Sequence, residues 1–238
     1  KALAFEKAGI IKKNGTIFCG EVRPNIKKVF MKEAIKNNAA LFFIHPPFEN
    51  IINAEHGEHQ QHNASLAIAA AKEINIKDNA IEQTLDNLKR LPCRFETMQQ
   101  SPQIILDGAH SPAKIAATVK KIKELKKPIH LIFGCAANKD APQMLKQLIP
   151  HVDKVTTTRF QMGMRKAAVP SELLKVAPKA KRAGSFLDHS EALDHAKKQS
   201  KNDEVIIATG SLFLTGELRA NWISEDQIVK SSNSFSHI

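Results

Sequence analysis

The feature that most constrains this chain is a regular alternation, from Leu91 to Trp222, of short apolar runs with amphipathic segments. The apolar runs are rich in strand-forming residues, and each is followed by a stretch with helical periodicity. Such an alternation is typical of a parallel sheet that helices cover on both faces. We expect strands at 104–106, 130–133, 154–157, 182–186 and 205–208. The predicted fold class is therefore α/β, with a Rossmann-like, mostly parallel sheet.

The helix expected after the first of these strands has the clearest signals. Ser111 is a suitable N-cap and Pro112 suits the first turn. An apolar stripe then follows at Ile115, Val119, Ile122 and Leu125. Polar residues suited to capping precede three later helices: Asp140, Ser171 and Ser190. The last helix is expected at 211–222, and the hydrophilic residues 224–238 are expected to form a flexible tail.

Residues 1–89 have a less regular pattern. We expect strands at 16–20 and 40–44, and helices at 26–36, 60–74 and 79–89, the last with Asp78 as N-cap. The apolar faces of these helices need a core that is built mostly by other residues, so this segment is interpreted as the tail end of a domain. The sequence thus predicts three parts, 1–89, 90–223 and 224–238.

Composition indicates a soluble globular protein. Hydrophobic residues make up 42% of the 238 positions, yet no apolar run approaches the roughly 18 residues that a membrane-spanning helix needs. The three cysteines form no C-x-x-C pair, so we expect neither a disulfide framework nor a thiolate zinc site, and a cytoplasmic location. The chain opens with Lys1 and has no basic-then-apolar leader, which suggests a fragment of a longer protein without a signal peptide.

The formal net charge of +11 raises the question of a polyanionic partner. The lysines are spread over solvated helix faces, and aromatic residues, which would stack on bases, make up only 5%. We therefore expect no nucleic-acid partner.

Polar residues that follow the predicted strands are the first candidates for chemistry, because ligands bind at the carboxyl ends of parallel strands. In 107–112 an acidic residue, Asp107, ends a strand, a glycine and His110 follow, and a helix begins. This arrangement suits a ribose hydroxyl or an anion. Alternatively, Asp107 only caps the turn and His110 is an exposed loop residue. Two weaker candidates are 134–140, with Lys139 beside Asp140, and 209–211.

Three histidines, His56, His59 and His62, are spaced three residues apart and raise the possibility of a metal site. On a helix the first and last would point in widely different directions, so a polar helix entrance that contacts a ligand through one or two of them is preferred.

Arg94 follows a proline at the expected domain junction and could reach a phosphate across a cleft. The alternative is that Arg94 pairs with Glu96. Cys93 is not expected to act as a nucleophile, because no orienting histidine is identifiable around it.

Five motifs occur in one order and carry a resemblance. They are Glu6-Lys7-Ala8-Gly9-Ile10-Ile11-Lys12, Gly57-x-His59-Gln60-x-x-Asn63-Ala64, Leu91-Pro92-x-Arg94-Phe95-Glu96, Asp107-Gly108-Ala109-His110-x-Pro112 and Thr209-Gly210-Ser211. Over Lys1 to about Trp222 the chain resembles the bifunctional dihydrofolate synthase/folylpolyglutamate synthase family of Mur-type ligases. The resemblance implies a Mur-type Rossmann-like carboxyl-terminal domain at 90–223, preceded at 1–89 by the carboxyl-terminal part of the ATP-binding domain.

The activity that this resemblance implies is ATP-dependent formation of an amide bond. A carboxylate of dihydropteroate, or of the terminal glutamate of a folate, is phosphorylated, and L-glutamate then attacks the acyl phosphate. The implied cofactors are ATP and Mg²⁺. No G-x-x-x-x-G-K-S/T phosphate loop occurs in these 238 residues, so the isolated chain is expected to be inactive. The partners are small molecules, with no membrane, and the protein is expected to be a monomer.

The resemblance also assigns roles to individual residues. Lys7 matches a lysine that is carbamylated in the family and helps to organise the metal site, whose other ligands would lie upstream. Asn63 matches a nucleotide contact, Arg94 the linker arginine that reaches the ATP phosphates, and Asp107 the carboxylate that holds the ribose.

For the incoming glutamate, the resemblance implies that His110 and Ser211 lie nearby. Arg165 matches a weaker family arginine to which we assign no role. Three departures from the family pattern put the substrate preference in doubt: Cys93 in place of glycine, Ser111 in place of asparagine and Asn138 in place of aspartate. Two alternatives stay open at this point, a Mur-type ligase of cell-wall precursors and a non-catalytic module that binds a nucleotide or a partner.

Overall fold

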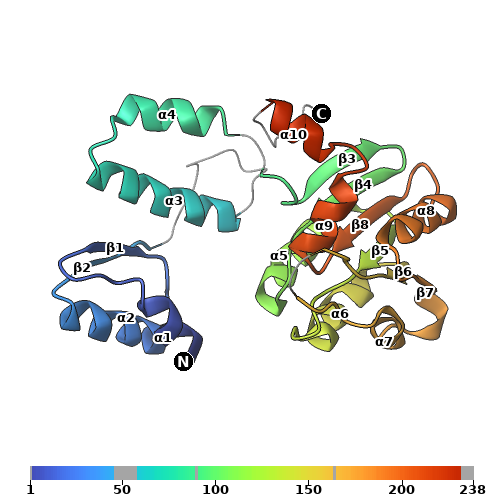
Figure 1. Ribbon diagram of the computed structural model, residues 1–238, viewed down its shortest axis with the longest axis horizontal. Helices are drawn as coiled ribbons and strands as arrows, with labels where there is room; N and C mark the ends of the chain where they lie inside the picture. Colours follow the sequence, from blue (N-terminus) through green and yellow to red (C-terminus); the bar gives the residue numbers. More distant parts are fainter. Residues whose placement is uncertain (1, 46–57, 89–90, 163–164, 232–238) are drawn as a thin grey trace. The chain divides into compact units, whose positions relative to one another are not determined.

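A computed structural model describes residues 2–45, 58–88, 91–162 and 165–231, with side chains from residue 60 in α3 and up to residue 230 in α10. The chain divides into two compact units, Lys1–Lys89 and Arg90–Ile238, and each is described by itself (Figure 1).

The first unit is built on a two-stranded parallel sheet. Its elements are α1 (Ala2–Ala8), β1 (Thr16–Cys19), α2 (Pro24–Lys36), β2 (Ala40–Phe43), α3 (Glu58–Glu73) and α4 (Asp78–Asp86). Thr16 of β1 lies opposite Ala40 of β2, and a small core forms around Ala8, Ile11 and Val29. The strands and the last three helices lie within a few residues of the predicted positions. The helix α1 was not predicted, because only Ala4 and Ala8 of this helix are buried and its apolar pattern is correspondingly weak.

The second unit contains a six-stranded sheet in the order β3-β4-β8-β5-β6-β7. Its strands are β3 (Glu96–Gln100), β4 (Gln103–Asp107), β5 (Ile129–Phe133), β6 (Lys154–Thr157), β7 (Arg182–Ser185) and β8 (Val205–Thr209). Only β3 runs antiparallel to its neighbour in this sheet, and the other pairs are parallel. The predicted α/β class with a mostly parallel sheet is therefore confirmed. The strand β3 was not predicted, because its sequence ETMQQ lacks an apolar β-branched run.

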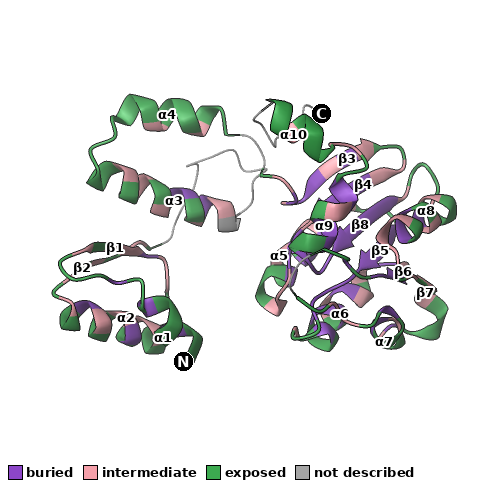
Figure 2. Cartoon of the chain, in the orientation of Figure 1, coloured by how far each residue is buried: buried purple, intermediate pink, exposed green. Residues whose placement is uncertain are grey.

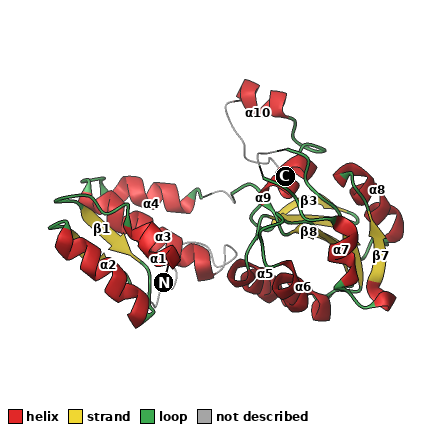
Figure 3. Ribbon diagram, turned by 60° about the horizontal axis from the view of Figure 1, so that its bottom comes forward, coloured by secondary structure: helices red, strands yellow, loops and turns green. Residues whose placement is uncertain are grey.

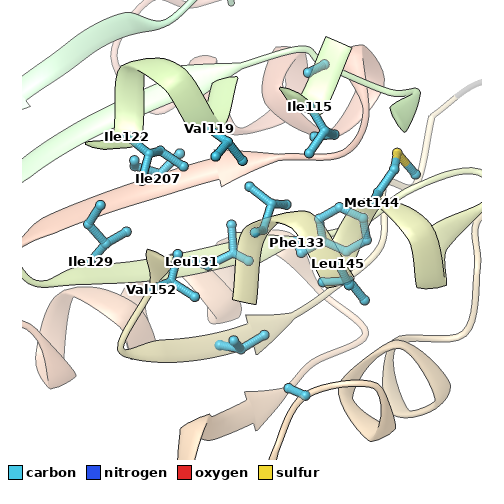
Figure 4. Close-up of a cluster of buried hydrophobic side chains, with 14 of the residues drawn as sticks. Ile115, Val119, Ile122, Ile129, Leu131, Phe133, Met144, Leu145, Val152 and Ile207 are labelled. Atoms are coloured by element: carbon cyan, nitrogen blue, oxygen red, sulfur yellow. The ribbon is translucent and has the colours of Figure 1, made fainter. Parts of the chain in front are cut away.

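Helices cover both faces of this sheet (Figure 3). They are α5 (Pro112–Leu125), α6 (Ala141–Leu148), α7 (Pro170–Lys175), α8 (His189–Gln199) and α9 (Leu212–Arg219). A further helix, α10 (Glu225–Ser231), follows them in the chain. One core packs α5, α6 and α7 against alternate strand residues such as Ile105 and Leu131 (Figure 4). A second core packs α8 and α9 against the residues between them, such as Ile104 and Ile132. Successive strand residues face opposite ways, and the central strands β4, β8 and β5 are buried on both faces, so these three contain nearly continuous apolar runs (Figure 2).

The helix caps agree only in part with the predictions. Ser111 is the N-cap residue of α5 but makes no side-chain cap bond, whereas Asp140 accepts a hydrogen bond from Gln143 N in α6. The prediction of Ser171 was wrong, because the proline of the first turn of α7 makes Val169 the N-cap. The predictions of two further caps were also wrong. Asp188 takes the place expected for Ser190, and Lys77 the place expected for Asp78.

The chain after the sheet is more ordered than the sequence predicted. The helix α9 ends at Arg219, and part of the segment expected to be a flexible tail forms α10. Ser224 and Gln227 explain this difference, because they exchange hydrogen bonds as a capping box: Gln227 N donates to Ser224 Oγ at 3.2 Å, and Ser224 N donates to Gln227 Oε1 at 2.9 Å. Residues 232–238 lie outside the described part. Among the described helices, none is long and apolar enough to cross a membrane.

Candidate functional site

The segment that carries Arg94 lies against the carboxyl end of β4. Gly108 N donates a hydrogen bond of 2.7 Å to Cys93 O. A Cβ atom at residue 108 would come within 2.6 Å of Leu212 Cδ1, which can move aside, and within 3.3 Å of the backbone atom Cys93 O, so glycine suits this close approach. Arg94 follows Cys93 and Asp107 precedes Gly108, so these two residues flank one backbone hydrogen bond within the second unit.

The three strand-end candidates lie at one edge of the sheet. Asp107, at the end of β4, is the register partner of Thr209 at the end of β8, and Gly210 N donates to Ala109 O at 3.0 Å. Gly134, after β5, donates to Thr209 O. The backbone at Gly210 has a φ of 108° and lies so close to Gly134 O that a Cβ atom would be 2.6 Å away. The carboxyl ends of three neighbouring strands thus form one surface.

The carboxylate of Asp107 has a structural role in this surface. Its Oδ1 accepts hydrogen bonds from Ala109 N at 2.8 Å and from Thr118 Oγ1 at 3.2 Å. Asp107 therefore does cap its own turn, as one reading of the sequence held. Within the described residues neither bond uses Oδ2, which leaves that oxygen as an acceptor for a ligand hydroxyl.

His110 is held in one tautomer by its neighbours. Its Nδ1 lies 2.8 Å from Gly108 O, and since a carbonyl oxygen only accepts, Nδ1 carries the hydrogen. Its Nε2 lies 3.2 Å from Lys114 Nζ and accepts from that ammonium. Burial, and then the charges of Lys114, Lys139 and Arg94, lower the pKa of His110, although the bond to Gly108 opposes this. The ring is therefore a neutral imidazole at physiological pH.

Cations gather around the Asp107 carboxylate. Burial lowers the pKa of Lys114, and the charges of Arg94 and Lys139 lower it further, while Asp107 raises it. Lys114 Nζ contacts His110 Nε2, and the charges of Arg94 and Lys139 act on both of these residues, so positive charge exceeds negative here. Such a neighbourhood suits an anion with several negative charges.

The alternative in which Arg94 pairs with Glu96 is wrong. Glu96 is 3% exposed and accepts two hydrogen bonds, each of 2.9 Å, from Arg219 in α9. Its Oε2 also accepts from Cys93 N at 2.8 Å. Arg219 was missed by the sequence analysis because it lies 123 positions from Glu96 at the end of a helix, and no local pattern connects the two.

Cys93 is buried, and Ser211 caps a helix. The thiol of Cys93 is 3% exposed, and burial raises its pKa, which agrees with the expectation that it is not a nucleophile. Ser211 is also buried, and its Oγ caps α9 by accepting from Phe213 N at 3.2 Å and Leu214 N at 3.5 Å. Arg165 is exposed.

Two site residues predicted from the resemblance belong to the first unit. Lys7 is exposed in the last turn of α1, and its Nζ lies 2.9 Å from Glu6 Oε1. Asn63 is exposed on α3, where its Nδ2 donates to Gln60 Oε1 at 2.8 Å. His56 and the side chain of His59 lie outside the described residues. The part of the chain that the structure describes contains no group of three His, Cys, Asp or Glu residues that could hold a metal ion.

Comparison with known proteins gives a consistent result. A family model described as "Mur ligase, glutamate ligase domain" matches residues 93–212. A dihydrofolate synthase/folylpolyglutamate synthase of Bacillus subtilis is 25% identical over 249 residues, which cover 91% of this chain and 57% of that protein.

Two solved structures share the fold. A folylpolyglutamate synthase of Mycobacterium tuberculosis, complexed with ADP, has a TM-score of 0.81 and 21% identity, covering 93% of this chain and 58% of that one. A bifunctional folylpolyglutamate synthase/dihydrofolate synthase of Yersinia pestis, complexed with AMPPNP and a manganese ion, has a TM-score of 0.74 and 21% identity, covering 92% and 56%. The chain thus spans less than two thirds of the length of each of these proteins.

Proposed function

This chain belongs to the Mur ligase family, and on that premise we propose that it is part of an ATP-dependent ligase that adds L-glutamate to dihydropteroate, to folates or to both. One observation carries the proposal: Gly108, which follows Asp107, contacts both Cys93 O and His110 Nδ1, so Arg94, Asp107 and His110 are neighbours at the carboxyl ends of the strands. All three lie inside the segment that matches a glutamate ligase domain. The relative in Bacillus subtilis, which aligns over most of this chain, supports the folate branch of the family. In this proposal, residues 1–89 are the end of the ATP-binding domain and 90–223 the Rossmann-like domain.

The proposed reaction needs charge neutralisation and positioning more than a covalent residue. The substrate carboxylate attacks the γ-phosphoryl group of ATP, ADP leaves, and the amine of L-glutamate then displaces phosphate from the acyl phosphate. Arg94 would neutralise phosphate charge, with Lys114 and Lys139 adding to the local positive potential. Asp107 would accept the ribose hydroxyls through Oδ2. His110 and Ser211 would lie near the incoming glutamate.

Lys7 and Asn63 are proposed to serve the nucleotide and metal side of the reaction from the first unit. Carbamylation would turn Lys7 from a cation, which now pairs with Glu6, into an anion. Among the described residues no carboxylate or histidine cluster fits Mg²⁺, so we assign no metal ligand there. In this proposal Mg²⁺ would have its ligands outside the described residues and would help the cations named above to neutralise phosphate charge. A chain treated with ¹³C-labelled bicarbonate that gives no carbamate resonance would remove Lys7 from this scheme.

The test compares acceptor substrates one at a time, with the complete gene product that carries this chain. ATP-dependent incorporation of a labelled amino acid is measured in three reactions: L-glutamate with dihydropteroate, L-glutamate with tetrahydrofolate, and D-glutamate or 2,6-diaminopimelate with a UDP-N-acetylmuramoyl acceptor. We expect incorporation with one or both pterin acceptors. Turnover of the muramoyl acceptor alone would assign the protein to the ligases of cell-wall precursors. Nucleotide binding without any turnover would favour a non-catalytic binding module. The isolated 238 residues are expected to give negligible ligation. The monomeric state and the cytoplasmic location stay predictions.

A further inference from the structure

Arg94 lies in a backbone segment that is held by a buried ion pair. Glu96 and Arg219 are 3% and 5% exposed and share two hydrogen bonds of 2.9 Å. Glu96 Oε2 accepts a third bond, from Cys93 N. One carboxylate therefore connects the residue before Arg94 to the last turn of α9. We call these two residues the Glu96–Arg219 clamp.

The backbone around Arg94 needs such support. Cys93 has a φ of 55° and Phe95 a φ of 54°, so both neighbours of Arg94 adopt the left-handed conformation without being glycine. Residues with a side chain adopt this conformation at an energetic cost, and they keep it only where surrounding contacts impose it. Two such contacts reach Cys93, through its N–H to Glu96 and through its carbonyl oxygen to Gly108 N. Phe95 is fixed by burial, since it is 7% exposed.

The clamp is an unusual way to stabilise a fold. A buried ion pair loses solvation, and well-packed apolar residues often replace it without loss of stability. An apolar pair at 96 and 219 would fill the same space, but it would leave Cys93 N without the carboxylate. The Glu96 carboxylate therefore provides an acceptor for Cys93 N, which apolar packing cannot provide.

We propose that Glu96 and Arg219 are positioning residues, which hold Cys93 and Phe95 in their left-handed conformation and so direct Arg94, between them, toward the anion site beside Asp107. This inference rests on the proposed function, because the ligand of Arg94 is taken to be the phosphate groups of a nucleotide. The clamp itself does not contact the nucleotide. Loss of the clamp should therefore reduce nucleotide affinity only as long as Arg94 is present.

The test uses the complete gene product that carries this chain, called the wild type below, with ADP as the probe and titration calorimetry. The double variant Glu96→Leu/Arg219→Met removes both charges together, so no unpaired buried ion is left. We expect it to bind ADP about ten- to a hundredfold more weakly than the wild type, as Arg94→Ala does, the size of the loss of a charged hydrogen bond. Adding Arg94→Ala to the double variant should cause no further loss. A purely structural role would instead weaken binding by the same factor with and without Arg94.

A matched control uses a second ion pair of the same unit. Lys154 Nζ lies 3.2 Å from Glu204 Oε2. Lys154 is the first residue of β6 and Glu204 precedes β8, so this pair lies at the amino ends of the strands, opposite the candidate site. The variant Lys154→Met/Glu204→Leu makes the same chemical change there and should leave ADP affinity within twofold of the wild type. If Glu96→Leu/Arg219→Met does not fold, Arg219→Lys decides by the same comparison, since it keeps the charge but cannot donate in the two-pronged geometry.

The outcomes separate this inference from the proposed function. A wild-type chain that binds ADP, with a clamp variant that binds it equally well, would overturn the positioning role alone. Equal further losses in the presence and absence of Arg94 would also overturn it. A wild-type chain that binds no ADP, or an Arg94→Ala variant that binds normally, would remove Arg94 from the nucleotide site and overturn both.

Discussion

A buried histidine makes the stability of the second unit depend on pH in a specific window. His130 on β5 is fully buried, with Nε2 2.7 Å from Thr156 Oγ1 and Nδ1 3.2 Å from Ser200 Oγ. Burial, and then the charges of Lys154 and His195, lower the pKa of His130 to about 4, although Glu204 opposes this. The folded protein therefore contains this residue as a neutral imidazole at neutral pH.

The sign and size of the effect follow from proton linkage. Between pH 6.5, the ordinary value for histidine, and about 4, the unfolded chain binds a proton at His130 that the folded chain does not bind. The free energy of unfolding therefore falls as the pH falls through this window, and His130 has no effect above about pH 7. One pKa unit corresponds to about 1.4 kcal/mol, so the loss is about 2 kcal/mol at pH 5 and about 3 kcal/mol when the window is complete.

The assay is urea unfolding at pH 7.5 and pH 5, followed by tryptophan fluorescence. The single tryptophan, Trp222, packs against the second core and reports on this unit. We expect the loss of stability between the two pH values to be about 2 kcal/mol smaller in His130→Gln than in the wild type. The control His151→Gln, at a partly exposed histidine, should keep most of the wild-type loss. Equal losses in His130→Gln and the wild type would refute this reasoning.

Three further predictions concern the carboxyl edge of the sheet. Asp107→Asn should weaken ADP binding by about 1.5 to 3 kcal/mol, the size of one charged hydrogen bond, and equal affinity by calorimetry would count against the ribose role. Lys114→Met removes a cation that lowers the pKa of His110, so NMR titration should give a higher pKa, and an unchanged value would contradict the 3.2 Å contact. Gly210→Ala should destabilise the unit by at least about 1 kcal/mol, measured by thermal unfolding, because alanine is strained at a φ of 108°.

The parts of the fold that could be predicted from the sequence are those in which local composition and burial agree. The runs at 129–133 and 205–209 are apolar except for His130 and Thr209, because every residue of these strands is buried. The strand β3 was not predictable in this way, since its place at the edge of the sheet requires only two buried residues among polar ones. The capping box of α10 was present as Ser224 and Gln227, a signal that the sequence reading overlooked.

The candidate site was predictable up to the point at which distant residues meet. The strand-end rule was enough to bring Asp107 and the 209–211 turn together, because parallel strands end at the same edge. It could not provide the partner of Glu96, because a sequence contains no record of contacts between residues 123 positions apart. Pairing of Glu96 with the nearby Arg94 was the natural alternative. The left-handed backbone at Cys93 and Phe95 could not be foreseen, because neither residue is glycine.

The position of β8 has a consequence for the synthesis of the protein. This strand is the last of the sheet to leave the ribosome, yet it pairs with β4 on one side and β5 on the other. Neither earlier strand can complete its ladder of hydrogen bonds until residues 205–209 have emerged. A chain interrupted before Val205 would expose two long apolar edges at the middle of the sheet, which is a hazard for aggregation. Assembly of the sheet in a nascent chain would therefore wait for residues 205–209, although β4 and β5 are synthesised well before them.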